Sequence, residues 1–174
     1  MPISIYHLTR TETEQTMNAL LNVLDHAEGL VKEGKIEEDA LMASNLAPDM
    51  MSLSMQVWRG SDNARAIGRL AGQDIPHFTE MGDLTIKEAR QLVNDTLALV
   101  RSISEEDLEG AEDRTVEITA RGKPTRFRGE DYLLRFAIPQ MGFHVTTAYG
   151  LVRKAGADIG KRHYLCDVFE YTVD

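Results

Sequence analysis

Apolar side chains recur at steps of three and four residues along four long stretches of the chain, the spacing that gives a helix one buried face. The first stretch runs from about Ser4 to Lys32 and is followed by Gly34, a typical helix stop. The second runs to about Ala71 from Pro48, which suits an early helical position because the proline lacks an N–H. The first half of the chain is therefore predicted to form two helices.

The third stretch has the clearest start signal in the sequence. Thr85-Ile86-Lys87-Glu88 matches a capping box, in which the Thr oxygen accepts from the N3 amide and the Glu bonds back to the cap amide. Its apolar positions continue to Ile103. The fourth stretch begins at Gly129 and ends near Gly156, and Pro139 inside it predicts a kink or a brief interruption.

Between the third and fourth helices the pattern changes to strict alternation, which indicates strands. Residues 115–119 and 125–128 alternate on either side of the turn Arg121-Gly122-Lys123-Pro124. Four amphipathic helices with connectors of moderate length predict an all-α fold, an antiparallel four-helix bundle. A small β-hairpin is inserted before the last long helix, and the 174 residues suit a single domain over 1–174.

Composition narrows the class of protein. The net charge of −9 argues against a general attraction to nucleic acid or to an anionic membrane. The sequence contains no run of about 18 apolar residues, the length needed to span a membrane. The single cysteine, Cys166, excludes an intramolecular disulfide and any zinc site with two cysteines. With no signal-peptide pattern at the start, we expect a cytoplasmic protein.

The charge is unevenly distributed along the chain. Residues 1–113 hold 9 basic and 21 acidic groups, whereas residues 114–174 hold 10 basic and 7 acidic groups. Part of the basic excess surrounds the hairpin, at Arg121, Lys123, Arg126 and Arg128, with Phe127 as a possible stacking residue for a nucleic acid. A solvated hairpin is the favoured interpretation, because basic side chains discourage pairing at a strand edge. A third interpretation is that these basic residues form ion pairs with the acidic segment 104–113 or with a second subunit.

Two blocks of sequence form a recognisable pattern. The first is Phe143-His144-Val145-Thr146-Thr147-Ala148-Tyr149-Gly150-Leu151-Val152-Arg153, followed by Gly156 and Ile159-Gly160-Lys161. The second is Leu46-x-Pro48-Asp49-Met50, then Gln56-Val57, Leu70-Ala71-Gly72 and Ile75-Pro76. Together these blocks resemble a bacterial family of unknown function within the DinB/YfiT-like superfamily. The resemblance extends over nearly the whole chain and implies a four-helix bundle of DinB type, often a homodimer.

The resemblance also implies a metal centre, but the carry-over of its ligands is incomplete. Better-known superfamily members hold a divalent metal on one histidine of the second helix and a His-x-x-x-His pair of the last long helix, and some use it in thiol-dependent transfer or hydrolysis. Here His144 matches the first histidine of the pair, Ala148 occupies the second position, and Gln56 is the nearest polar candidate in the second helix. One ligand of three does not make a nickel or zinc site.

Several side chains are candidates for a pocket in the bundle. His144 borders the buried stripe of the last helix, where it is either a ligand or acid–base group or a core-edge histidine bonded to a neighbouring helix. Gln56 could be that partner or could face outward, and Trp58 and Tyr149 could line the pocket or simply pack. His163 and Cys166 form a weak half-site, with Cys166 favoured as a small buried apolar residue.

The leading hypothesis is therefore a cytoplasmic DinB-like protein without the complete metal triad, homodimeric, with a binding or non-catalytic role and no cofactor. A small molecule could occupy the bundle pocket. The alternative is a metal-dependent enzyme, a thiol-dependent transferase or hydrolase, with a rebuilt nickel or zinc site of His144, Gln56 and Asp49. The remaining histidines, His7, His26 and His77, are assigned no role.

Overall fold

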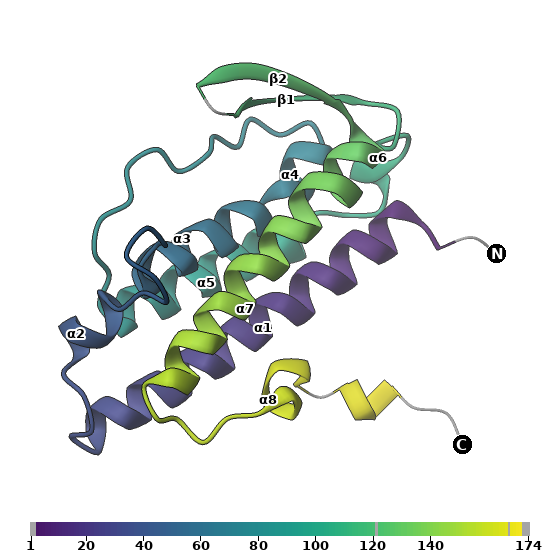
Figure 1. The fold of residues 1–174 in the computed structure, drawn as a ribbon. Helices are drawn as coiled ribbons and strands as arrows, with labels where there is room; N and C mark the ends of the chain where they lie inside the picture. The colour runs from purple at the N-terminus through teal and green to yellow at the C-terminus, as the bar shows by residue number, and fades with distance from the viewer. Residues whose placement is uncertain (1–2, 121, 167, 172–174) are drawn as a thin grey trace.

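A computed structural model describes residues 3–120, 122–166 and 168–171. Figure 1 shows four long helical segments packed side by side, with a two-stranded hairpin at one end of the bundle. The long segments are α1 (Ile5–Lys32), α3 (Leu53–Ala64) continued by α4 (Ala66–Leu70), α5 (Ile86–Ser102) and α7 (Ile138–Lys154). The predicted helical bundle with an inserted hairpin is confirmed.

Shorter elements connect and cover these helices. They are α2 (Glu38–Met42), η1 (Glu106–Leu108), β1 (Thr115–Ala120), β2 (Lys123–Arg128), α6 (Gly129–Asp131), η2 (Tyr132–Ala137), α8 (Lys161–Leu165) and η3 (Val168–Tyr171). None of the helices in the described part of the chain has the length and apolar character needed to cross a membrane.

The direction of the helices follows from the long connection between α4 and α5. Residues 72–84, here called the strap, run back along α3, so that α3 and α5 point the same way (Figure 1). Hydrogen bonds mark this path: the indole N–H of Trp58 donates to the carbonyl of Gly82 (3.0 Å), and the Leu84 N–H donates to Ser54 Oγ (3.2 Å). The bundle is thus antiparallel across α3 and α7 and across α1 and α5, but parallel across α3 and α5.

Two helix starts carry the local signals that the sequence shows. Ser4 caps α1 by accepting a hydrogen bond from the His7 N–H, and both halves of the Thr85–Glu88 capping box are present at the start of α5. Gly34 adopts φ +67°, a left-handed conformation that ends α1 at little steric cost. These ends are set by neighbouring residues, which is why they agree with the sequence pattern.

The start of the second long helix is a correction. It begins at Leu53 rather than at Pro48, because Ser52 supplies the cap: its Oγ accepts a hydrogen bond from the Met55 N–H. Pro48 instead lies in a turn that is closed by a bond from the Met50 N–H to the Ala47 carbonyl. The helix is also divided at Arg65, where α3 ends and α4 begins.

The interruption predicted at Pro139 takes a specific form. Residues Tyr132–Ala137 are π-helical, and regular α-helix resumes at Ile138 with Pro139 in its first turn, where a missing N–H is tolerated. The hairpin has the register Val116↔Phe127 and Glu117↔Arg126, and β2 already begins at Lys123, so the turn is shorter than predicted.

The core consists of two clusters of buried apolar side chains. The larger fills the bundle between α1, α3, α5 and α7 and includes Met17, Leu20, Val57, Val93 and Val145. The second lies beneath the hairpin, where Ile67, Val100 and Tyr132 pack together. The region between α3, α7 and the strap carries the polar side chains considered next.

Candidate functional site

His144 and Gln56 form a buried hydrogen-bonded pair between α7 and α3. The ring nitrogen Nδ1 of His144 lies 2.7 Å from Oε1 of Gln56, and the two residues are 6% and 1% exposed. The amide nitrogen of Gln56 donates in turn to the Met51 carbonyl (3.1 Å). Because an amide oxygen can only accept, Nδ1 of His144 carries the proton in this pair.

The surroundings of His144 hold its ring neutral. Burial, and secondarily the positive charge of Arg59, lower the pKa of His144 to about 4. At pH 7 the ring is therefore an uncharged imidazole that donates from Nδ1. Of the two interpretations that the sequence left open, the histidine bonded to a neighbouring helix agrees with this geometry.

Gly60 allows α7 to approach α3 closely at this level. A Cβ atom on Gly60 would stand 3.2 Å from Val145 Cγ2 and 3.9 Å from the Cβ of His144. At the far end of the same segment, a Cβ on Gly68 would stand 2.2 Å from the Ile75 side chain of the strap. Gly60 and Gly68 therefore both serve close contacts within the chain.

The residues around His144 do not fit the three-histidine metal centre of the superfamily. Both ends of the Gln56 amide are already hydrogen-bonded, to His144 and to Met51, and Ala148 has no donor atom. Asp49, the third ligand of the rebuilt site, is exposed. Within the ranges that the structure describes, no three His, Cys, Asp or Glu side chains gather in an arrangement able to hold a metal ion.

The two aromatic candidates face different segments of the molecule. Trp58 donates to Gly82 of the strap and stands edge-on to Phe78, with ring centroids 4.8 Å apart. Tyr149 stands edge-on to Tyr164 of α8, with ring centroids 6.1 Å apart. Both side chains therefore take part in packing, one against the strap and the other against α8.

A second buried polar cluster, centred on Asp62, was not anticipated from the sequence. The Asp62 carboxylate is 3% exposed and accepts from Nη2 of Arg69 (2.6 Å) and Nδ1 of His77 (2.6 Å). The backbone N–H of Phe78 donates to it as well (3.4 Å). Burial by itself raises the pKa of Asp62, but the hydrogen bond from His77 and the charge of Arg69 outweigh it, so the pKa lies below its usual value.

This cluster attaches the strap to the bundle. Arg69 donates from Nε to the Ile75 carbonyl (2.8 Å) and from Nη2 to the Pro76 carbonyl (3.3 Å). Asp62 and Arg69 are seven residues apart, so they lie on one helix face, and that spacing was the available signal. His77, which was assigned no role, could not be joined to them without knowing the path of the strap.

The remaining candidates are engaged in local contacts. Nδ1 of His163 accepts from the Gly160 N–H (2.8 Å), so this nitrogen is not open to a metal. On the hairpin, Arg126 pairs with Glu117 (2.7 Å) and Arg128 with Asp113 of the acidic segment (2.7 Å). These pairs are the intramolecular alternative for the basic cluster, and Arg121 lies outside the described residues.

Comparison with known proteins agrees with the fold and with the sequence resemblance. A solved structure of a DinB family member protein from Shewanella denitrificans is 32% identical, superposes with a TM-score of 0.80, and is matched over 93% of this chain and 92% of that chain. No curated protein matches the sequence. A family model described as a domain of unknown function, DUF1993, matches residues 5–165. The chain therefore belongs to the DUF1993 family and has a DinB-like fold.

Proposed function

We propose that this protein is a binding protein that works without the metal centre of the DinB superfamily. The observation that carries the proposal is the state of Gln56, whose amide is bonded at one end to His144 and at the other to the Met51 carbonyl. A metal ligand at this position would have to break one of these buried bonds and leave a polar group without a partner.

The chemistry of His144 supports the same view. The ring is neutral and could in principle offer a lone pair, but a single imidazole binds nickel or zinc weakly without further ligands. Ala148 stands one helical turn further along α7, where the superfamily resemblance would place the second histidine. In this chain the hydrogen bond between His144 and Gln56 joins α7 to α3 instead.

Metal analysis tests the proposal directly. Protein purified without a histidine tag is dialysed against zinc or nickel and its metal content is measured, with His144→Ala and, as the matched control, the exposed His7→Ala. We expect far less than one metal per chain in all three. One metal per chain that is lost in His144→Ala but kept in His7→Ala would overturn the proposal and support the metal-dependent enzyme.

We also propose that the protein forms a homodimer, through the outer face of α7. Phe143 is 57% exposed and Leu46 is 43% exposed, two of the five large apolar side chains that stand out on the surface of the described residues. The Leu46 side chain lies beside Gly150, seven residues and about two turns after Phe143, so the two apolar groups share one face. An exposed apolar stripe is a typical subunit contact.

Sedimentation velocity at micromolar concentration tests the dimer. We expect a species of twice the 19.5 kDa chain mass, and its loss in Phe143→Asn. The control is Tyr171→Asn, which changes another exposed large side chain away from α7. A wild-type protein that sediments as a single chain would refute the dimer.

The cytoplasmic location stays a prediction.

A further inference from the structure

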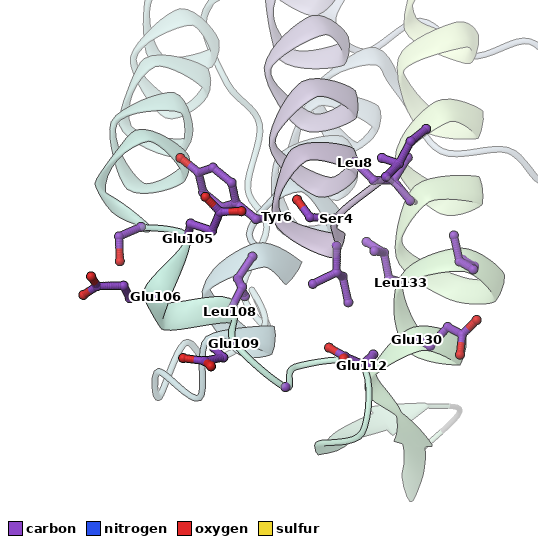
Figure 2. Close-up of a pocket in the computed structure, with 15 residues that line it drawn as sticks. Ser4, Tyr6, Leu8, Glu105, Glu106, Leu108, Glu109, Glu112, Glu130 and Leu133 are labelled. Atoms are coloured by element: carbon purple, nitrogen blue, oxygen red, sulfur yellow. The ribbon is translucent and has the colours of Figure 1, made fainter. Parts of the chain in front are cut away.

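A large pocket lies at one end of the bundle, away from His144. It has a volume of about 1070 Å³ and opens between the first turn of α1, η1 and the start of the last long helix, as Figure 2 shows. Its apolar lining comes from all three segments: Ile5 and Leu8 of α1, Leu108 of η1, and Leu133 of η2. This size is slightly above the usual range for small-molecule sites, about 300–1,000 Å³.

Apolar side chains remain exposed at the mouth of this pocket. Ile3 is 71% exposed and Leu134 is 46% exposed, and both line it. Leu133 and Leu134 belong to the π-helical segment, and π-helical turns inside α-helices are frequent at functional sites. The pocket therefore offers an apolar surface that the rest of the described chain does not cover.

The rim of the pocket is acidic. Five exposed glutamates line it, and Figure 2 shows them on both sides of the opening: Glu105, Glu106, Glu109, Glu112 and Glu130. The lining contains no Lys, Arg or His, and the one ion pair made by these glutamates within the described ranges is a long one, 3.9 Å between Glu130 and Arg128.

The neighbouring arginines make their hydrogen bonds away from the side-chain carboxylates of this rim. The guanidinium of Arg114 donates to the backbone carbonyls of Leu70, Asp107 and Glu109, and Arg128 is bonded to Asp113. Arg10, near Tyr6 at the pocket edge, is bonded to Glu14 (2.9 Å). A rim lined by five carboxylates and no basic side chain, over an apolar surface, favours a ligand with positive charge and an apolar body.

We propose that this pocket binds an aliphatic polyamine, a methylene chain that carries two or more separate ammonium groups. Such a chain can lay its methylenes on the leucines while its ammonium groups reach separate glutamates. A small monocation would leave most carboxylates without a partner, and a bare divalent ion would gain nothing from the apolar lining. The inference extends the proposed binding function to a named ligand class, at a place separate from the His144–Gln56 pair.

Calorimetric titration of the whole protein tests this proposal with four probes: spermidine, hexylamine, 1,6-hexanediol and magnesium chloride at matched ionic strength. We expect saturable binding in the order spermidine, then hexylamine, with none for the diol or for magnesium. Raising the salt from about 50 to about 300 mM should weaken spermidine binding, since exposed charges are screened over shorter distances.

Variants locate the site. The double variant Glu112→Gln/Glu130→Gln removes two adjacent rim charges, and we expect it to weaken spermidine binding about tenfold, at roughly threefold per exposed carboxylate. Leu134→Asn should weaken it about threefold through the lost apolar contact. The control is Glu80→Gln/Asp83→Asn, which removes two exposed charges of the strap outside the pocket and should leave the affinity unchanged.

The outcomes separate this proposal from the function proposed above. Absence of saturable spermidine binding, equal binding of magnesium or the diol, or equal weakening in the Glu80 and Asp83 control would overturn the polyamine site. None of these results bears on the metal content at His144, which is measured independently. Conversely, a metal bound at His144 would leave the polyamine titration valid.

Discussion

The carboxylate of Asp62 should be the most sensitive single charge in the protein. It is the common partner of Arg69, His77 and the Phe78 N–H, and it compensates the charge of Arg69, whose side chain is only 6% exposed. Asp62→Asn keeps the shape and one accepting oxygen but removes the charge. The guanidinium of Arg69 would then be a buried cation with only neutral partners, and the strap would lose part of its attachment to α3.

The expected loss in free energy of unfolding is large for a substitution that replaces one carboxylate oxygen by an amide nitrogen. Removing one partner of a buried ion pair destabilises a protein by about 3–5 kcal/mol, and because asparagine still accepts one hydrogen bond we expect the lower end, about 3 kcal/mol. Urea denaturation followed by circular dichroism measures this loss. With a slope of about 2 kcal/mol per molar urea, the midpoint falls by about 1.5 M.

The matched control is Asp113→Asn, which breaks an ion pair of similar geometry on the surface. Asp113 lies 2.7 Å from Arg128, but their side chains are 74% and 55% exposed, so we expect a midpoint close to that of the wild type. A midpoint shift for Asp62→Asn no larger than that of the control would refute the reasoning. Because the pKa of Asp62 is lowered by folding, its contribution is present above about pH 4 and is lost as the pH falls through its folded pKa.

Three further outcomes follow from the same structure. Between pH 6.5 and 4 His144 becomes protonated in the unfolded chain but not in the folded chain. The free energy of unfolding of the wild type, relative to that of His144→Asn, should therefore fall by about 3 kcal/mol over that range. Denaturation measurements in which the two proteins show the same pH dependence would contradict this. Gly129→Ala places a Cβ 1.9 Å from the Ala111 carbonyl oxygen and should lower thermal stability by about 2 kcal/mol or more, whereas Gly142→Ala, with open space around it, should not. Thr85→Ala removes the cap of α5 and should lower the free energy of unfolding by about 1 kcal/mol, measured by urea denaturation.

The helices could be predicted because their signals are local. The spacing of apolar residues and the capping box depend on residues within one or two turns. The apolar positions at helical spacing along α5 and its C-cap are all buried: Ile86, Ala89, Val93, Leu97, Val100 and Ile103. The start of α3 was placed five residues early because Pro48 and Ser52 are both good start signals. The serine prevails because the chain between them forms a turn, which the sequence pattern does not distinguish.

The His144–Gln56 contact could be raised as an alternative but not decided from the sequence. The apolar stripe placed His144 at the edge of the core, and a buried imidazole requires a hydrogen-bond partner. Which residue supplies that partner depends on the rotation of α3 about its axis and on how closely α7 approaches it, which Gly60 permits. One residue of rotation would turn Gln56 away, and no feature of a single helix specifies that angle.

Only the Asp62–Arg69 half of the second polar cluster left a signal in the sequence, because the contacts with His77 and the strap carbonyls exist only once the strap has returned along α3. Of the eleven polar or charged residues buried within the described ranges, six belong to α3 and α4: Ser54, Gln56, Ser61, Asp62, Asn63 and Arg69. On an ordinary bundle helix such residues would face solvent. Here the irregular strap covers part of this face, and its Gly82 and Ile75 carbonyls accept hydrogen bonds from Trp58 and Arg69. Side chains of α3 and α4 therefore satisfy backbone carbonyls of the strap, and this explains why polar residues are buried on a helix face that would otherwise meet solvent.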